Sequence, residues 1–246
     1  MDHLLNDLIA NNDLSSYGEN KVNPFNLSKR LPVILLIDTS NIMKSKETLI
    51  SETIEKLYDT ILLDRAASNA VELSIITFNN CVNILEKMRE IKTHENKGRN
   101  LHIHCNGSSL MGFGLKAAIA QLEFRKKVYY NERPRIKYYM PVLFIISNGK
   151  ILSDSFDELN KRDEEFFLFS KYYIHQQVSK NKLAIFAFPT DENYNIKTVT
   201  ELTGLDKDHH VSICKNSEVI SSVLSLIWGY TNHAHKLGDP TINDIL

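Results

Sequence analysis

The sequence predicts an α/β fold: a doubly wound, mostly parallel central sheet with helices on both faces. The first observation is a set of short apolar runs, such as Val33–Asp38 and Val142–Ser147, whose length and composition are typical of strands buried on both faces. The second is that amphipathic stretches of helical length separate these runs. Such alternation favours parallel pairing, with ligands bound at the carboxyl ends of the strands.

The first half of the chain shows the pattern most clearly. After the strand that ends at Asp38, apolar residues recur at i, i+3 and i+4 through Glu47–Asn69, which predicts an amphipathic helix. Val71–Phe78 predicts the next strand, and the Asn79-Asn80 pair favours a tight turn into a short strand, Val82–Leu85. We therefore expect one antiparallel hairpin at the edge of the sheet.

The second half continues the alternation of helices and strands. The expected elements are helix Leu110–Tyr130, strand Val142–Ser147, helix Ser155–Ser179, strand Leu183–Phe188, helix Ile196–Thr203, strand Val211–Ile213 and helix Glu218–Tyr230. We assign residues 30–232 to one domain, 1–29 to an N-terminal arm and 233–246 to a C-terminal tail. The arm carries an apolar stripe, Leu4, Leu5, Leu8 and Ile9, which predicts a short helix packed on its own domain or docked on a partner.

Composition narrows the class of protein. The 246 residues include 29 Lys plus Arg and 30 Asp plus Glu, a formal net charge of -1, so no global basic field favours nucleic acid. Three cysteines without a CxxC pair argue against a disulfide framework and a zinc ribbon, which favours a reducing compartment. The N-terminus lacks the pattern of a signal peptide, and the apolar runs are too short to cross a membrane. We expect a cytoplasmic protein.

Three loops follow apolar strands or open a helix, and they carry a recognisable pattern. They read DTSNI from Asp38, GSSLMGFGL from Gly107 and SNG from Ser147. Their order and spacing resemble the metal-ion-dependent adhesion site of a von Willebrand factor A domain, which draws a DxSxS motif, a Thr and an Asp from these loops. The flanking sequences LPVILLIDTSNIM and MPVLFIISNG are most similar to the bacterial tellurite-resistance TerY group.

The resemblance implies roles for individual residues. Asp38 matches the first carboxylate, Ser40 the first hydroxyl ligand, Ser109 the Thr of the second loop and Asn148 the Asp of the third, so these four residues would hold Mg²⁺. Ile42 replaces the second hydroxyl of the DxSxS motif, and Asn148 removes one negative charge. Because Mg²⁺ requires oxygen ligands, we expect a degenerate site. The loops then keep their shape through hydrogen bonds, with Asp38 as a structural acceptor.

The resulting hypothesis is a non-catalytic protein–protein interaction module. The resemblance to the TerY group implies a scaffold or adaptor in bacterial stress response, such as tellurite or chemical resistance or phage defence, beside a protein kinase and a phosphatase. The expected partner-binding rim comprises Asp38, Ser40, Asn41, Ser108, Ser109 and Asn148.

Two alternative functions use other features of the sequence. One is a metal-dependent phosphohydrolase with Asp38 as nucleophile, although Ser40 stands where such enzymes place a second Asp. The other is a nucleic-acid-binding protein that uses the basic, Tyr-rich stretch Arg125–Lys137, a composition that also suits an acidic protein partner. The net charge makes nucleic acid the less favoured partner.

Two further clusters have structural explanations. His102 and His104 would share one face of a strand, but two histidines and Cys105 do not complete a zinc site. The acidic residues from Asp163 to Glu165 suit the N-terminal region of a helix, and the aromatic residues that follow them suit a packed face. Some of these aromatic side chains exceed the needs of one face and are candidates for an interface.

Overall fold

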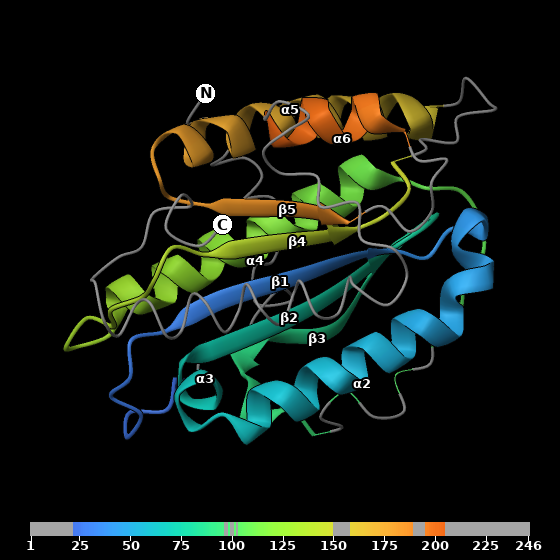
Figure 1. Ribbon diagram of the computed structural model, residues 1–246. Helices are drawn as coiled ribbons and strands as arrows, with labels where there is room; N and C mark the ends of the chain where they lie inside the picture. Colours follow the sequence, from blue (N-terminus) through green and yellow to red (C-terminus); the bar gives the residue numbers. More distant parts are fainter. Residues whose placement is uncertain are drawn as a thin grey trace.

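A computed structural model describes residues 22–95, 98, 101, 103–149, 158–188 and 195–204. It contains a five-stranded sheet in the order β3-β2-β1-β4-β5, shown in Figure 1. The strands are β1 Leu31–Asp38, β2 Val71–Phe78, β3 Val82–Glu90, β4 Val142–Ile146 and β5 Ala184–Phe188. β1 pairs in parallel with β2 and β4, β4 pairs in parallel with β5, and β3 pairs antiparallel with β2. The mostly parallel sheet with one edge hairpin is confirmed.

Helices cover both faces of this sheet (Figure 1). They are η2 Asn41–Lys46, α2 Glu47–Leu63, α3 Arg65–Ala70, η3 Ile91–Thr93, α4 Met111–Asn131, α5 Glu158–Ser179 and α6 Ile196–Thr203. Alternate side chains of β1 enter two separate cores: Val33 and Leu35 pack with α2 and α3, whereas Ile34 and Leu36 pack with α4 and α5. Because every residue of β1 and β2 is buried, the apolar runs read correctly as central strands.

Two predicted boundaries are wrong. The helix expected through Glu47–Asn69 breaks at Asp64, whose extended backbone ends α2 and whose Oδ1 accepts the Ala66 and Ala67 amides as the cap of α3. The strand expected to end at Leu85 continues to Glu90, because β3 pairs with β2 from Phe78 back to Glu72 despite its many polar residues. Asp64 thus changes the direction of the chain where hydrophobic periodicity alone predicts continuity.

Several predictions lie outside the described residues. These concern most of the N-terminal arm 1–29, the strand Val211–Ile213, the helix Glu218–Tyr230 and the C-terminal tail 233–246. Within the described part of the chain, none of the helices combines the length and apolarity needed to cross a bilayer.

Candidate functional site

The expected rim lies at the carboxyl edge of the sheet, where β1 and β4 end side by side. Ile37 pairs with Ile146, so Asp38, the last residue of β1, and Ser147, the first residue after β4, lie at the same level of the sheet. Residues 103–110 return the chain to this edge before α4 begins at Met111. Strand register and chain return therefore bring together three loops that are distant in sequence.

Asp38 is the acceptor that joins these loops. Its Oδ1 accepts the Ser40 amide at 2.9 Å, and its Oδ2 accepts the hydroxyls of Ser109 at 3.0 Å and Ser147 at 2.8 Å. Asp38 is only 2% exposed, so its negative charge is compensated by these donors rather than by bulk water. The expected role of Asp38 as a structural acceptor is confirmed.

Backbone hydrogen bonds fix the loop that follows β1. The Thr39 amide donates to Phe78 O at 2.8 Å, and Thr39 O accepts the Asn106 amide at 2.8 Å. The Asn41 amide donates to Gly107 O at 3.0 Å. The loop after β1 is thus bonded on one side to β2 and on the other to the loop before α4.

The predicted rim residues fall into two groups. Ser40, Ser109 and Asn148 are buried with Asp38, and Asn148 O accepts the Asn195 amide at 2.8 Å. Ser108 is half-buried and Asn41 is exposed. The structure therefore brings all six residues to one edge, but the buried ones support the loops while Ser108 and Asn41 face the exterior.

Sequence analysis missed several polar residues of this edge. Ser147 stands in the third motif without an expected role, yet its hydroxyl donates to Asp38 and accepts the Gly149 amide at 3.0 Å. The Asn79 amide group donates to Asn106 Oδ1 at 2.9 Å, and Asn80 Oδ1 accepts the Ser108 amide. The Asn79-Asn80 turn was visible in the sequence, but its contact with residues 106–108 depends on the return of the chain.

The donor set does not fit a stably bound Mg²⁺. Of the four described residues expected to hold the ion, Asp38 alone is a carboxylate, Asn148 offers a neutral amide, and the Ile42 side chain has no ligand atom. Ser40 Oγ is buried and has no hydrogen-bond partner in the described part of the chain, but a neutral oxygen does not replace the missing charge. Two unit charges about 4 Å apart attract by roughly 4 kcal/mol at an effective dielectric constant near 20, and the attraction of a divalent cation to one carboxylate is about twice that. Among the described residues, no group of three or more His, Cys, Asp or Glu side chains is placed to hold a metal ion.

The helix that starts at this edge, α4, is capped by a residue of α5. Asp163 Oδ1 accepts the Phe113 amide at 2.9 Å, and burial raises the pKa of Asp163 from 3.8 to about 6. The expectation that Asp163 serves the N-terminal region of its own helix is wrong, because α5 begins at Glu158 and the carboxylate faces the first turn of α4. A Cβ on Gly112 would lie 1.9 Å from Asp163 O, so the two helices meet with no spare room.

The aromatic residues after Asp163 divide between core and surface. Phe167 and Tyr173 are buried in the core shared with α4, as expected. Tyr172 is 44% exposed, and Phe166 stacks edge-on against Phe113. The prediction that some of these rings are exposed is confirmed for Tyr172.

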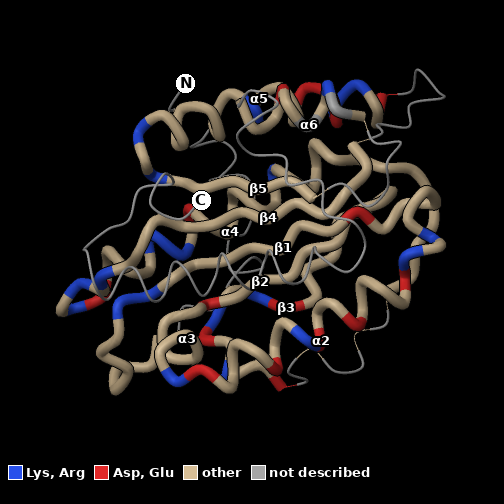
Figure 2. The backbone as a smooth tube through the Cα atoms, viewed as in Figure 1, with Lys and Arg blue, Asp and Glu red and all other residues tan. Residues whose placement is uncertain are grey.

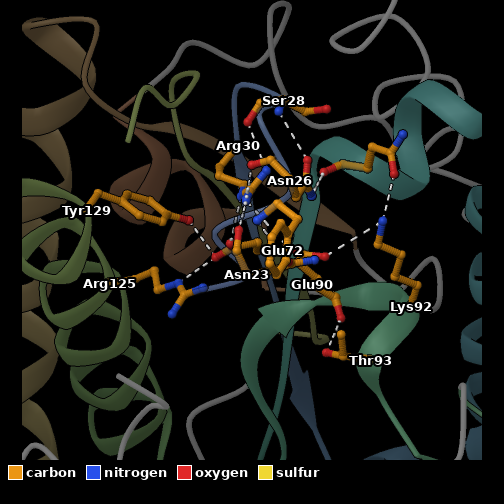
Figure 3. Close-up of polar contacts among 12 residues, drawn as sticks. Asn23, Asn26, Ser28, Arg30, Glu72, Glu90, Lys92, Thr93, Arg125 and Tyr129 are labelled. Carbon is orange, nitrogen blue, oxygen red and sulfur yellow. Dashed lines mark hydrogen bonds and ion pairs between the residues drawn. The ribbon is translucent and has the colours of Figure 1, made fainter. Parts of the chain in front are cut away.

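The predicted basic surface from Arg125 to Lys137 is wrong at its first residues (Figure 3). Arg125 is 1% exposed, and its Nε lies 2.5 Å from Glu72 Oε2. The Tyr129 hydroxyl donates to the same oxygen at 2.6 Å, while Arg30 Nε lies 3.3 Å from Glu72 Oε1. Glu72 stands near the start of β2, 53 residues before Arg125, and this long-range partner allows the guanidinium to enter the core. Arg125 and Tyr129 therefore cannot contact nucleic acid.

The histidine cluster does not form the expected strand. Residues 103–106 have no regular secondary structure, Cys105 is buried and His104 is exposed. The Cys105 amide donates to Glu47 Oε1 at 2.7 Å, which ties this segment to α2. His102, His209, His210, His233, His235 and Cys214 lie outside the described residues.

Comparison with known proteins identifies the fold. The sequence matches no protein-family model and no curated protein. Similar solved structures include manganese-loaded TRAP of Plasmodium vivax, with 12% identity, a TM-score of 0.54, and coverage of 79% of this chain and 72% of that one. A von Willebrand factor type A protein of Catenulispora acidiphila has 13% identity, a TM-score of 0.53, and coverage of 81% and 42%. The chain has the von Willebrand factor A fold.

A third solved structure, from the mussel byssus, is similar in fold as well. Proximal thread matrix protein 1 from the mussel byssus has 13% identity and a TM-score of 0.51, with 82% of this chain and 48% of that one covered. The chain thus spans about half the length of the mussel protein. At these identities the likeness concerns the fold alone, and it confirms the doubly wound architecture predicted from the strands.

Proposed function

We propose that this von Willebrand A-type domain is a cytoplasmic protein–protein interaction module that binds its partner through the rim without a metal ion. The observation that carries the proposal is the set of three hydrogen bonds that the Asp38 carboxylate accepts from Ser40, Ser109 and Ser147. These hydrogen bonds hold the three loops in one arrangement, which lowers the entropy lost on binding. The exposed side chains of Asn41, Asn80 and Asn106 are then available to a partner.

The same geometry supports a non-catalytic role. A nucleophilic carboxylate must reach the substrate, whereas Asp38 is 2% exposed and accepts three hydrogen bonds. Ser40 lies at the position where a phosphohydrolase of this type needs an acid. These observations favour an interaction module over the phosphohydrolase alternative.

For the pathway, we propose a TerY-like adaptor in bacterial stress response. Its support is the resemblance of the three motifs to that group, in which a protein kinase and a phosphatase accompany the domain. The rim would then recruit one of these enzymes. This proposal on the pathway is more specific than the proposal of an interaction module, and it can be wrong while the interaction module is right.

Affinity capture from cells that express the chain tests both levels. The capture uses wild type, Asn41→Arg and Ser108→Arg, with Thr60→Arg on the exposed side of α2 as the matched control, each in buffer with and without EDTA. We expect a stoichiometric partner that both rim variants lose and that Thr60→Arg and EDTA leave bound. A kinase or phosphatase supports the adaptor role, and another protein overturns that role alone. A partner that EDTA removes, or that ignores both rim variants, overturns the metal-free rim.

A further inference from the structure

A basic surface lies at the end of the molecule opposite the rim. It consists of Lys29, Lys127, Arg133, Arg135 and Lys137, here called the basic end surface, at the C-terminus of α4 and in its connection to β4. α4 has 21 residues and begins at the rim, so its C-terminus lies about 30 Å away. Figure 2 shows Lys and Arg gathered at this end of the fold.

The connection after α4 holds its cations on an ordered backbone. Arg133 Nη1 donates to the carbonyl oxygens of Tyr130, Asn131 and Glu132 at 2.9, 3.1 and 2.9 Å, which caps the end of the helix. The Arg135 guanidinium lies 4.0 Å from the centre of the Tyr130 ring. Arg133 is therefore a structural residue, whereas Arg135 and Tyr130 present a paired charged and aromatic surface.

Among the described residues, cations outnumber carboxylates in this stretch of the chain. Lys126 is neutralised by Glu123, with Nζ 2.8 Å from Oε1. Lys127, Arg133, Arg135 and Lys137 are exposed, and Glu132 is the carboxylate in the same stretch. Lys29, in the segment before β1, is half-buried and places its Nζ 4.1 Å from the Tyr139 ring centre. The net positive charge would attract an anionic partner through longer-range forces as well as by contact.

We propose that the basic end surface binds an acidic segment of a partner protein. Exposed Arg and Tyr side chains are enriched among the anchors of protein interfaces, and Tyr130 is 57% exposed. Arg135 covers one face of Tyr130, and Tyr138 packs against buried Tyr129 at 5.1 Å between ring centres. These rings do not form the row of free faces on which successive bases stack. An acidic polypeptide therefore suits the surface better than a single-stranded nucleic acid.

With the basic end surface in addition to the rim, the domain would have two separate binding surfaces, one at each end of α4. A partner at the rim and an acidic segment at the basic end surface would be separated by the length of α4, so neither blocks the other. A domain with two such surfaces can bridge two proteins. Variants at one end should leave binding at the other unchanged.

Fluorescence anisotropy with two defined probes tests the proposal. The probes are a fluorescein-labelled oligoglutamate and a fluorescein-labelled oligouridine of equal charge. The test variant is Lys127→Glu with Arg135→Glu and Lys137→Glu, which spares the helix-capping Arg133. The control reverses the same number of exposed charges elsewhere, at Lys56, Lys161 and Lys180. Circular dichroism of all proteins establishes that they are folded.

We expect wild type to bind oligoglutamate more tightly than oligouridine, with an affinity that falls as salt rises. The test variant should weaken oligoglutamate binding by about tenfold or more, and the control by about twofold or less. Equal loss in the test and control variants overturns the proposal, because it shows only the effect of net charge. Absent oligoglutamate binding, or tighter binding of oligouridine, also overturns it.

Discussion

The Ser147 hydroxyl donates to Asp38 Oδ2 at 2.8 Å, a buried hydrogen bond between residues 109 positions apart in the sequence. It connects the ends of β1 and β4 directly. Because Ser109 donates to the same oxygen at 3.0 Å, two neutral hydroxyls compensate one buried charge. The rim is therefore held together by the protein's own donors.

Ser147→Ala should destabilise the domain by about 1–3 kcal/mol, because it removes one donor to a buried carboxylate and one acceptor of the Gly149 amide. Urea unfolding followed by circular dichroism measures the free energy of unfolding. Ser45→Ala, on the exposed side of η2, is the matched control and should change it by less than about 0.5 kcal/mol. Equal stability of the two variants would contradict the role of Ser147.

Asp163→Asn should alter the dependence of stability on pH. The pKa of Asp163 rises from 3.8 to about 6 in the folded state, so the folded protein binds the proton more tightly than the unfolded chain. This contribution to stability is complete below about pH 4 and is lost as pH rises through about 6. The unfolding free energy of wild type should therefore fall by about 3 kcal/mol relative to Asp163→Asn between pH 4 and pH 7. Parallel pH profiles would contradict the buried cap.

Gly112→Ala should be more damaging than Gly114→Ala. A Cβ at Gly112 meets the Asp163 backbone oxygen at 1.9 Å, whereas one at Gly114 meets the Phe78 side chain at 2.9 Å. A backbone atom of a packed helix cannot move away as a ring can, so we expect a loss of about 3 kcal/mol or more at Gly112 and a smaller loss at Gly114. Thermal unfolding of both variants measures this order, and the reverse order would contradict the close packing of α4 and α5.

Arg125→Ala and Lys127→Ala should differ in their effect on the free energy of unfolding, because Arg125 is buried and Lys127 is exposed. Arg125→Ala leaves the buried Glu72 with one of its two cationic partners and should cost about 3–5 kcal/mol. Lys127 is exposed, so its replacement should change the free energy of unfolding by less than about 0.5 kcal/mol. Chemical denaturation distinguishes the two. A loss of less than about 0.5 kcal/mol in both variants would contradict the buried ion pair of Arg125 and would support the nucleic-acid-binding alternative.

Sequence patterns predicted the sheet, its edge hairpin and the loops of the rim, because apolar runs and motif spacing are local properties. They did not predict side-chain partners that depend on long-range register. Arg125 was expected on a basic surface and Asp163 at the start of its own helix, yet Arg125 pairs with Glu72 and Asp163 caps α4. In the sequence, Ser147 is only the residue before Asn148 in the third motif. Its hydrogen bond to Asp38 depends on the pairing of β1 with β4, which no local pattern reveals.

The most direct test of the metal-free rim is a titration of Mg²⁺ and Mn²⁺ followed by thermal shift and calorimetry. Wild type is compared with Asp38→Asn and with the double variant Ile42→Ser, Asn148→Asp, which restores the missing hydroxyl and carboxylate. We predict no saturable stabilisation or heat with wild type at millimolar metal, and saturable binding by the double variant. Saturable binding by wild type that Asp38→Asn abolishes would contradict the account.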